Sequence, residues 1–176
     1  LFRSGTARQA LSQYGDDSAL RLMLAGILEA RGKADEAIAE YELLILSDPT
    51  STVVANNLAS LLSEKSDDPR ALERAFNIAV RFQNSDVPQF LDTLGWIHYL
   101  RGDNHAALPL LKRAAEKLPK SGAVQFHLGM ALKQAGEAEL SARTLERAIT
   151  LPRLPADDMK TAAATIEQLK AANPAN

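Results

Sequence analysis

Three histidines and two pairs of adjacent carboxylates are the residues of this sequence best suited to acid–base or metal chemistry. The histidines are His98, His105 and His127. No H-E-x-x-H motif accompanies them, so the sequence lacks the i, i+4 histidine pair that holds zinc on a helix. We interpret His98 as a core residue that is satisfied by a neighbouring side chain. The sequence therefore predicts no metal site and no cofactor.

The carboxylate pairs are Asp67–Asp68 and Asp157–Asp158, and each stands before or at an expected helix start. The helix macrodipole favours negative charge at that place, so a structural role explains both pairs. We expect Asp67 to cap the helix that follows it, with Pro69 in the first turn. The sequence also lacks a G-x-S-x-G nucleophile elbow and a glycine-rich phosphate loop. These absences predict that the chain is not an enzyme.

The amino-acid composition argues against nucleic acid and the membrane interior as partners of this chain. The 176 residues include 20 Lys and Arg against 22 Asp and Glu, which gives a net charge of −2. This balance provides no electrostatic footprint for nucleic acid. No apolar run approaches the roughly 20 residues that span a bilayer. We therefore expect neither nucleic-acid binding nor direct membrane insertion, and the absence of cysteine excludes disulfides and thiolate metal sites.

The elements that position these residues repeat about every 34 residues. Gly102 pairs with Gly136 at this spacing, and Gly95 pairs with Gly129. Self-similarity at such a period indicates stacked supersecondary units. Aromatic residues make up only 5% of the chain while alanine is plentiful, which favours helices packed closely through small side chains over a bulky β core.

The repeat is clearest in the stretch from Val87 to Pro119. Its first part places four residues at the i, i+3, i+4 and i+7 positions, on one face of a helix: Leu91, Leu94, Gly95 and His98. We expect Gly102 to take the left-handed conformation that ends this helix and Asp103 to cap the next one. Two amphipathic helices joined by so short a turn must lie antiparallel and pack face to face.

These residues resemble the signature of the tetratricopeptide repeat. The matching positions in this stretch are Leu94, Gly95, Gly102, Ala107, Leu111, Ala114 and Pro119. Equivalent residues recur in repeats that start at Ser18, Thr52 and Gly122. The resemblance implies an all-α fold, a right-handed α-solenoid of antiparallel helix pairs with about ten helices. The small residues Gly95 and Gly129 would stand where two helix backbones approach each other.

We expect one solenoid domain over residues 1–176 with six segments: a half repeat at 1–17, repeats at 18–51, 52–87, 88–121 and 122–155, and a C-terminal capping helix at 156–172. The half repeat lacks a first helix. We therefore interpret the chain as a fragment of a larger bacterial array.

The resemblance also implies a concave groove lined by the first helix of each repeat. Its positions predict a partner-binding site made of Asn56, Ser60, Asp92, Trp96, Tyr99, Phe126, Met130 and Lys133. Aromatic anchors with a polar rim are what a peptide-binding hot spot needs. The alternative, that Trp96 and Tyr99 pack between adjacent helices as core, stays open. Of the residues with which some family members grip a C-terminal carboxylate, only Asn57 has a match, which disfavours that role.

Two functions fit these observations. The first is a non-catalytic protein–protein interaction scaffold that binds a peptide or helix of a protein partner in the groove. The alternative is a structural spacer of a longer solenoid, or a module that self-associates through the ends of the array. The runs Asn56–Leu62 and Leu91–Trp96 are similar to repeats of large bacterial proteins, several of which are envelope lipoproteins or accessory proteins of exopolysaccharide export and surface-protein sorting. This similarity implies an export or sorting assembly in the bacterial periplasm or cell envelope.

Overall fold

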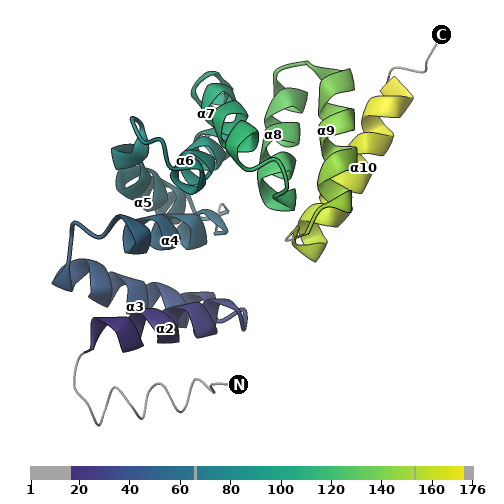
Figure 1. Ribbon diagram of the computed structural model, residues 1–176. Coiled ribbons are helices and arrows are strands. Elements are labelled where there is room, and N and C mark those ends of the chain that lie inside the picture. Colours follow the sequence, from purple (N-terminus) through teal and green to yellow (C-terminus); the bar gives the residue numbers. More distant parts are fainter. Residues whose placement is uncertain (1–16, 66, 153, 173–176) are drawn as a thin grey trace. The chain divides into compact units, whose positions relative to one another are not determined.

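The described part of the chain is helical and contains no strand. A computed structural model describes residues 17–65, 67–152 and 154–172. Nine α-helices and one short 3₁₀ helix lie within these residues (Figure 1), which confirms the all-α fold. The half repeat predicted for residues 1–17 lies, up to residue 16, outside the described residues. The chain divides into an N-terminal unit that ends at Ala79 and a C-terminal unit that begins at Val80.

The N-terminal unit contains four described helices: α2 (Ser18–Glu29), α3 (Ala34–Ser47), α4 (Thr52–Ser63) and α5 (Pro69–Ala79). Each helix packs against the next one along the chain. Their buried faces consist mainly of leucine and alanine, including the fully buried Leu24, Ala25 and Leu28 of α2. Small side chains let the helix axes approach closely, so the unit needs few aromatic residues in its core.

Among the described residues of the N-terminal unit, Tyr41 is the largest fully buried side chain, with 1% of its surface exposed. Its hydroxyl donates a hydrogen bond of 2.9 Å to Glu29 Oε2 and accepts one of 3.4 Å from Asn57 Nδ2. The phenol thus joins α3 to α2 and α4. Burial raises the pKa of Tyr41 above its ordinary value, and the hydrogen bond to Glu29 raises it further.

We expect the N-terminal unit to lose stability at alkaline pH through Tyr41. Above pH ~10, the ordinary pKa of tyrosine, the unfolded chain releases this proton while the folded chain keeps it. The free energy of unfolding therefore falls as the pH rises from the unfolded pKa toward the higher folded pKa. Urea denaturation at neutral and alkaline pH measures the loss, and Tyr41→Phe should remove this part of it. An equal alkaline loss in Tyr41→Phe would contradict the assignment.

The C-terminal unit begins with a 3₁₀ helix, η1 (Val80–Phe82). Five α-helices follow: α6 (Pro88–Leu100), α7 (Asn104–Lys117), α8 (Gly122–Gln134), α9 (Ala138–Thr150) and α10 (Ala156–Ala172). Consecutive helices pack against each other, and α8 also contacts both α6 and α10. Because α8 contacts both of the other helices, we call these three helices the α6–α8–α10 row.

The turns of the C-terminal unit follow the glycine pattern. Gly102 has a φ of 80° and Asp103 accepts a 3.1 Å hydrogen bond from the Ala106 N–H, so both predictions for this turn are confirmed. Gly136 ends α8 with the same φ of 80°. One period of 34 residues after Gly136, the chain has Lys170 in place of glycine. The helix α10 does not end there but continues to Ala172. The glycine marks the end of a helix because few other residues adopt this conformation without strain.

The remaining glycines of the period stand where two helices touch. A Cβ atom added to Gly95 would lie 2.8 Å from Leu111 Cγ, and one added to Gly129 would lie 2.6 Å from Leu145 Cγ. The buried Ser141 of α9 also donates a 2.8 Å hydrogen bond to the Gly129 carbonyl. The expected close approach of helix backbones is therefore confirmed at both positions.

Candidate protein-binding site

The predicted site residues are divided between the two units. Asn56 and Ser60 lie one turn apart on α4 of the N-terminal unit, where Ser60 is exposed. The Oδ1 atom of Asn56 is buried and has no hydrogen-bond partner among the described residues. The other six lie on two neighbouring helices of the C-terminal unit: Asp92, Trp96 and Tyr99 on α6, and Phe126, Met130 and Lys133 on α8.

Trp96 is the centre of an aromatic stack. Its ring lies 4.7 Å from the Tyr99 ring at an interplanar angle of 13°, and 4.2 Å from the His127 ring at 18°. All three side chains are partly exposed. Burial raises the pKa of Tyr99, so its phenol stays neutral beside the indole at physiological pH. Stacked aromatic pairs add roughly 0.5–1.5 kcal/mol beyond their buried area, and this stack fixes the orientation of Trp96.

Phe126 belongs to the core. Only 3% of its surface is exposed, and it packs in a cluster with Leu145, Ala148, Ala162 and Ile166. Its ring lies 5.8 Å from Trp96 in a tilted arrangement. Trp96 and Met130 are partly buried against the same cluster. Phe126 therefore supports Trp96 from the core side, while Trp96 is partly core and partly surface.

Polar contacts join neighbouring helices of the α6–α8–α10 row. Each contact connects residues 35 positions apart: Asp92 to His127 at 2.9 Å, Met130 to Thr165 at 3.9 Å, and Lys133 to Gln168 at 3.1 Å. Equivalent positions of adjacent repeats are 34 residues apart, so each contact is offset by one residue. Three of the predicted site residues thus take part in a ladder of contacts that orders this face.

His127 and Asp158 are members of this face that the sequence reasoning missed. His127 and its partner Asp92 have 16% and 14% of their side-chain surfaces exposed. Asp158 lies in the first turn of α10, as expected, and also interacts electrostatically with His127. Burial is the main cause that raises the pKa of Asp158; the nearby His127 lowers it and Asp157 raises it. The regular spacing of 35 residues between Asp92 and His127 was the signal available in the sequence.

The remaining residues that could take part in acid–base or metal chemistry do not lie together. His98 Nδ1 lies 3.3 Å from Asp103 Oδ2 in the turn after α6, and His105 is exposed at the start of α7. Across the described residues, no three His, Cys, Asp or Glu side chains gather closely enough to hold a metal ion. Among the described helices, none has the length and apolarity needed to cross a membrane.

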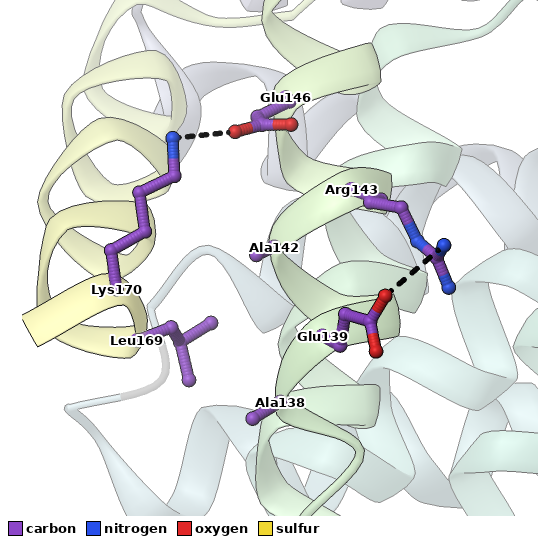
Figure 2. Close-up of a pocket in the computed structure, with 7 residues that line it drawn as sticks. All are labelled: Ala138, Glu139, Ala142, Arg143, Glu146, Leu169 and Lys170. Carbon is purple, nitrogen blue, oxygen red and sulfur yellow. Dashed lines mark ion pairs between the residues drawn. The ribbon is translucent and has the colours of Figure 1, made fainter. Parts of the chain in front are cut away.

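Two surface grooves of the C-terminal unit lie away from the predicted site. One, of about 220 Å³, lies between α9 and α10 and is flanked by the Glu139–Arg143 and Glu146–Lys170 ion pairs (Figure 2). The other, of about 340 Å³, runs over α7, α8 and α9 and has Leu128, Leu132 and Leu140 among its lining residues. Neither groove is lined by a predicted site residue.

Models of a known protein family match two parts of this chain. Two tetratricopeptide repeat models match residues 6–62 and 93–176. The TPR repeat-containing protein PA4667 of Pseudomonas aeruginosa is 26% identical over 122 residues, which are 69% of this chain and 20% of that protein. The chain thus spans about a fifth of the length of this curated relative.

Solved structures share the fold. TTC0263, a thermophilic TPR protein of Thermus thermophilus, superposes with a TM-score of 0.69 at 16% identity, over 89% of this chain and 82% of that one. YrrB, described as a TPR protein with an unusual peptide-binding site, superposes with a TM-score of 0.62 at 17% identity, over 94% and 84%. Repeats of this kind typically serve as non-catalytic scaffolds for protein–protein interaction. By its repeat signature, its helix pairs and these matches, the chain belongs to the tetratricopeptide repeat family.

Proposed function

We propose that the C-terminal unit binds a peptide or helical segment of a protein partner on the face of the α6–α8–α10 row, with Trp96 as the anchor. The stack of Trp96 on Tyr99 and His127 carries this proposal. A partly exposed indole that is already fixed in orientation loses little conformational entropy when a partner covers it. Tryptophan and tyrosine are also the residues most enriched in binding hot spots.

The surroundings of Trp96 indicate the chemistry of the partner. Met130 adds a flexible apolar side chain that packs against the same core cluster as Trp96, and Lys133 of α8 and Gln168 of α10 provide hydrogen-bonding groups. A segment with one or two large apolar side chains, flanked by residues that can hydrogen-bond, fits this arrangement. The peptide-binding site ascribed to YrrB, which shares the fold, supports the proposal by analogy.

Selection of displayed peptides against the chain, followed by affinity measurement on variants, tests the proposal. Trp96→Ala should weaken the selected peptides by at least about 30-fold, which corresponds to a hot spot of 2 kcal/mol. The matched control is Leu140→Ala, which removes an apolar side chain that is 40% exposed on α9. This control should change the affinity by less than about twofold. Circular dichroism must show that both variants keep the wild-type helix content.

The control also distinguishes the face of the α6–α8–α10 row from the groove over α7, α8 and α9. Loss of affinity in Leu140→Ala with none in Trp96→Ala would place the peptide in the groove over α7, α8 and α9. Equal affinity in both variants would contradict a discrete site on either surface and would favour the structural-spacer alternative.

We propose further that the partner belongs to a bacterial envelope assembly for export or sorting. The runs Asn56–Leu62 and Leu91–Trp96 and the Pseudomonas relative support a bacterial setting. Fractionation of cells that express the tagged parent protein measures its compartment. Recovery in the cytosolic fraction would contradict the envelope proposal and would leave the binding proposal unaffected.

A further inference from the structure

The groove of about 340 Å³ over α7, α8 and α9 is lined by one face of each of these helices. On α8 the lining residues are Gln125, Leu128 and Leu132, which share a helix face because they are three and four positions apart. The predicted site residues of α8, from Phe126 to Lys133, follow a similar spacing on another face. The groove and the face of the α6–α8–α10 row are therefore separate surfaces that share one helix.

Gln125 is a buried polar side chain that the chain leaves without a partner. Only 5% of its surface is exposed, and its amide forms no hydrogen bond with any described residue. The unpartnered side-chain atoms that are sealed from solvent within the described residues belong to Asn56 and Asn104, so the Gln125 amide still reaches the groove that it lines. A buried amide without a partner costs free energy, and folded proteins normally satisfy such groups. Its partner must come from whatever occupies the groove.

The two sides of the groove carry opposite charges that the chain does not neutralise. Glu116 on α7 forms no ion pair with any described residue. Arg147 on α9 donates a 2.9 Å hydrogen bond to the Pro119 carbonyl, a neutral acceptor, and pairs with no described carboxylate. The third charged residue of the lining, Lys112, lies 3.5 Å from its partner Glu137. An occupant therefore meets one uncompensated negative charge from α7 and one uncompensated positive charge from α9.

These groups define the chemistry of the occupant. A glutamine amide both donates and accepts, so it matches the N–H and C=O groups of a peptide backbone. A helix uses these backbone groups internally, whereas an extended segment leaves them available. Leu128 and Leu132 add apolar surface for one apolar side chain. The groove thus fits an extended peptide that is apolar at its centre and carries both signs of charge.

We propose that the groove over α7, α8 and α9 is a second binding site, which takes an extended peptide segment of a protein partner. Gln125 hydrogen-bonds the main chain of this segment, Glu116 attracts a basic residue and Arg147 attracts an acidic one. This site goes beyond the proposed function and does not rest on it, because Trp96 and the other predicted site residues do not line the groove.

NMR titration of the wild-type chain with short capped peptides tests the site. Each peptide holds a central leucine, and one lysine and one aspartate occupy every other pair of positions in turn, with serine elsewhere. At least one arrangement should shift the side-chain amide signals of Gln125 without moving the indole N–H signal of Trp96, the single tryptophan of the chain. If no peptide shifts the Gln125 signals, the proposal is wrong, whether or not the Trp96 signal responds. Failure of the proposed function is a separate result, since it is measured at Trp96.

Gln125→Met separates a binding role of the amide from a structural one. The substitution keeps the length of the side chain and removes its hydrogen-bonding groups, so it should weaken the peptide that shifts Gln125 most by about 3- to 10-fold. Because the amide has no partner in the free chain, the urea midpoint should not fall. A lower midpoint with unchanged peptide affinity would show that Gln125 serves the fold, which would overturn the proposal.

A double-mutant cycle tests the charge on α7. Glu116→Gln should weaken the lysine-containing peptide by about two- to fivefold, as expected for an exposed ion pair. It should not weaken the same peptide with glutamine in place of its lysine. The matched control is Glu167→Gln, which removes an exposed carboxylate of α10 outside the groove and should leave both affinities unchanged. Equal effects of Glu116→Gln on the two peptides would contradict the proposed recognition of a basic residue.

Discussion

Replacing Leu145 by alanine is expected to lower the free energy of unfolding of the C-terminal unit by about 2–5 kcal/mol. Leu145 is fully buried on α9 and packs in a cluster with Phe126 of α8 and with Ala162 and Ile166 of α10. Its side chain therefore fills the space between three helices. Truncation removes the transfer free energy of the lost carbons and leaves a cavity that these helices can close only in part.

Urea denaturation followed by circular dichroism measures this loss as a lower transition midpoint. The control is Leu140→Ala on the same helix, where the side chain is 40% exposed. The free energy of unfolding of this variant should stay within about 0.5 kcal/mol of the wild-type value, because the substitution removes little buried apolar surface. Similar losses in both variants would show that the cluster around Leu145 does not hold the unit together.

The period of 34 residues made most of the fold predictable. It located the turn at Gly102 and the N-terminal cap of α7 at Asp103. The turn needs a particular backbone conformation and the cap needs a side-chain acceptor. The cap of α5 was predicted less well. We expected Asp67 to cap this helix, but Asp68 accepts the 2.9 Å hydrogen bond from the Arg70 N–H. Both residues can act as caps, and only the position of the first helical turn decides between them.

The candidate site was predictable in part. Helical position alone placed Trp96 and Tyr99 on the α6–α8–α10 row, where the structure stacks them. It also assigned Phe126 to the groove, whereas Phe126 is 3% exposed and packs with residues of α9 and α10. A repeat pattern gives the direction of a side chain on its own helix. It does not show how closely the next helix covers that side chain, so core and surface residues near the boundary were not separated.

His127 shows which information the pattern did contain. Its contact with Asp92 spans 35 residues, as do the contacts Met130–Thr165 and Lys133–Gln168. A search for complementary side chains one residue beyond the period would have paired all three. Asp158, which stands 31 residues after His127, interacts with it from the first turn of α10 and follows no such rule. Its role depends on the packing of α10 against α8, which only the structure provides.

Gly129→Val is expected to destabilise the C-terminal unit by about 3 kcal/mol. A Cβ atom at this position would lie 2.6 Å from both Cγ and Cδ2 of Leu145 and 3.4 Å from its backbone nitrogen. Rotation of the leucine cannot relieve the contact, because Leu145 is itself fully buried in the cluster. The hydrogen bond between Ser141 and the Gly129 carbonyl also holds α9 at this distance. The valine must therefore push the two helices apart.

The same substitution at Gly26 separates packing from helix propensity. Gly26 lies inside α2, and nothing stands within 4 Å of an added Cβ atom. Valine is better than glycine in a helix by only a few tenths of a kcal/mol, so Gly26→Val should be nearly neutral. Thermal and urea denaturation of the two variants give the comparison. If Gly129→Val were as stable as Gly26→Val, the glycine at this place in the period would not be required by the contact between α8 and α9.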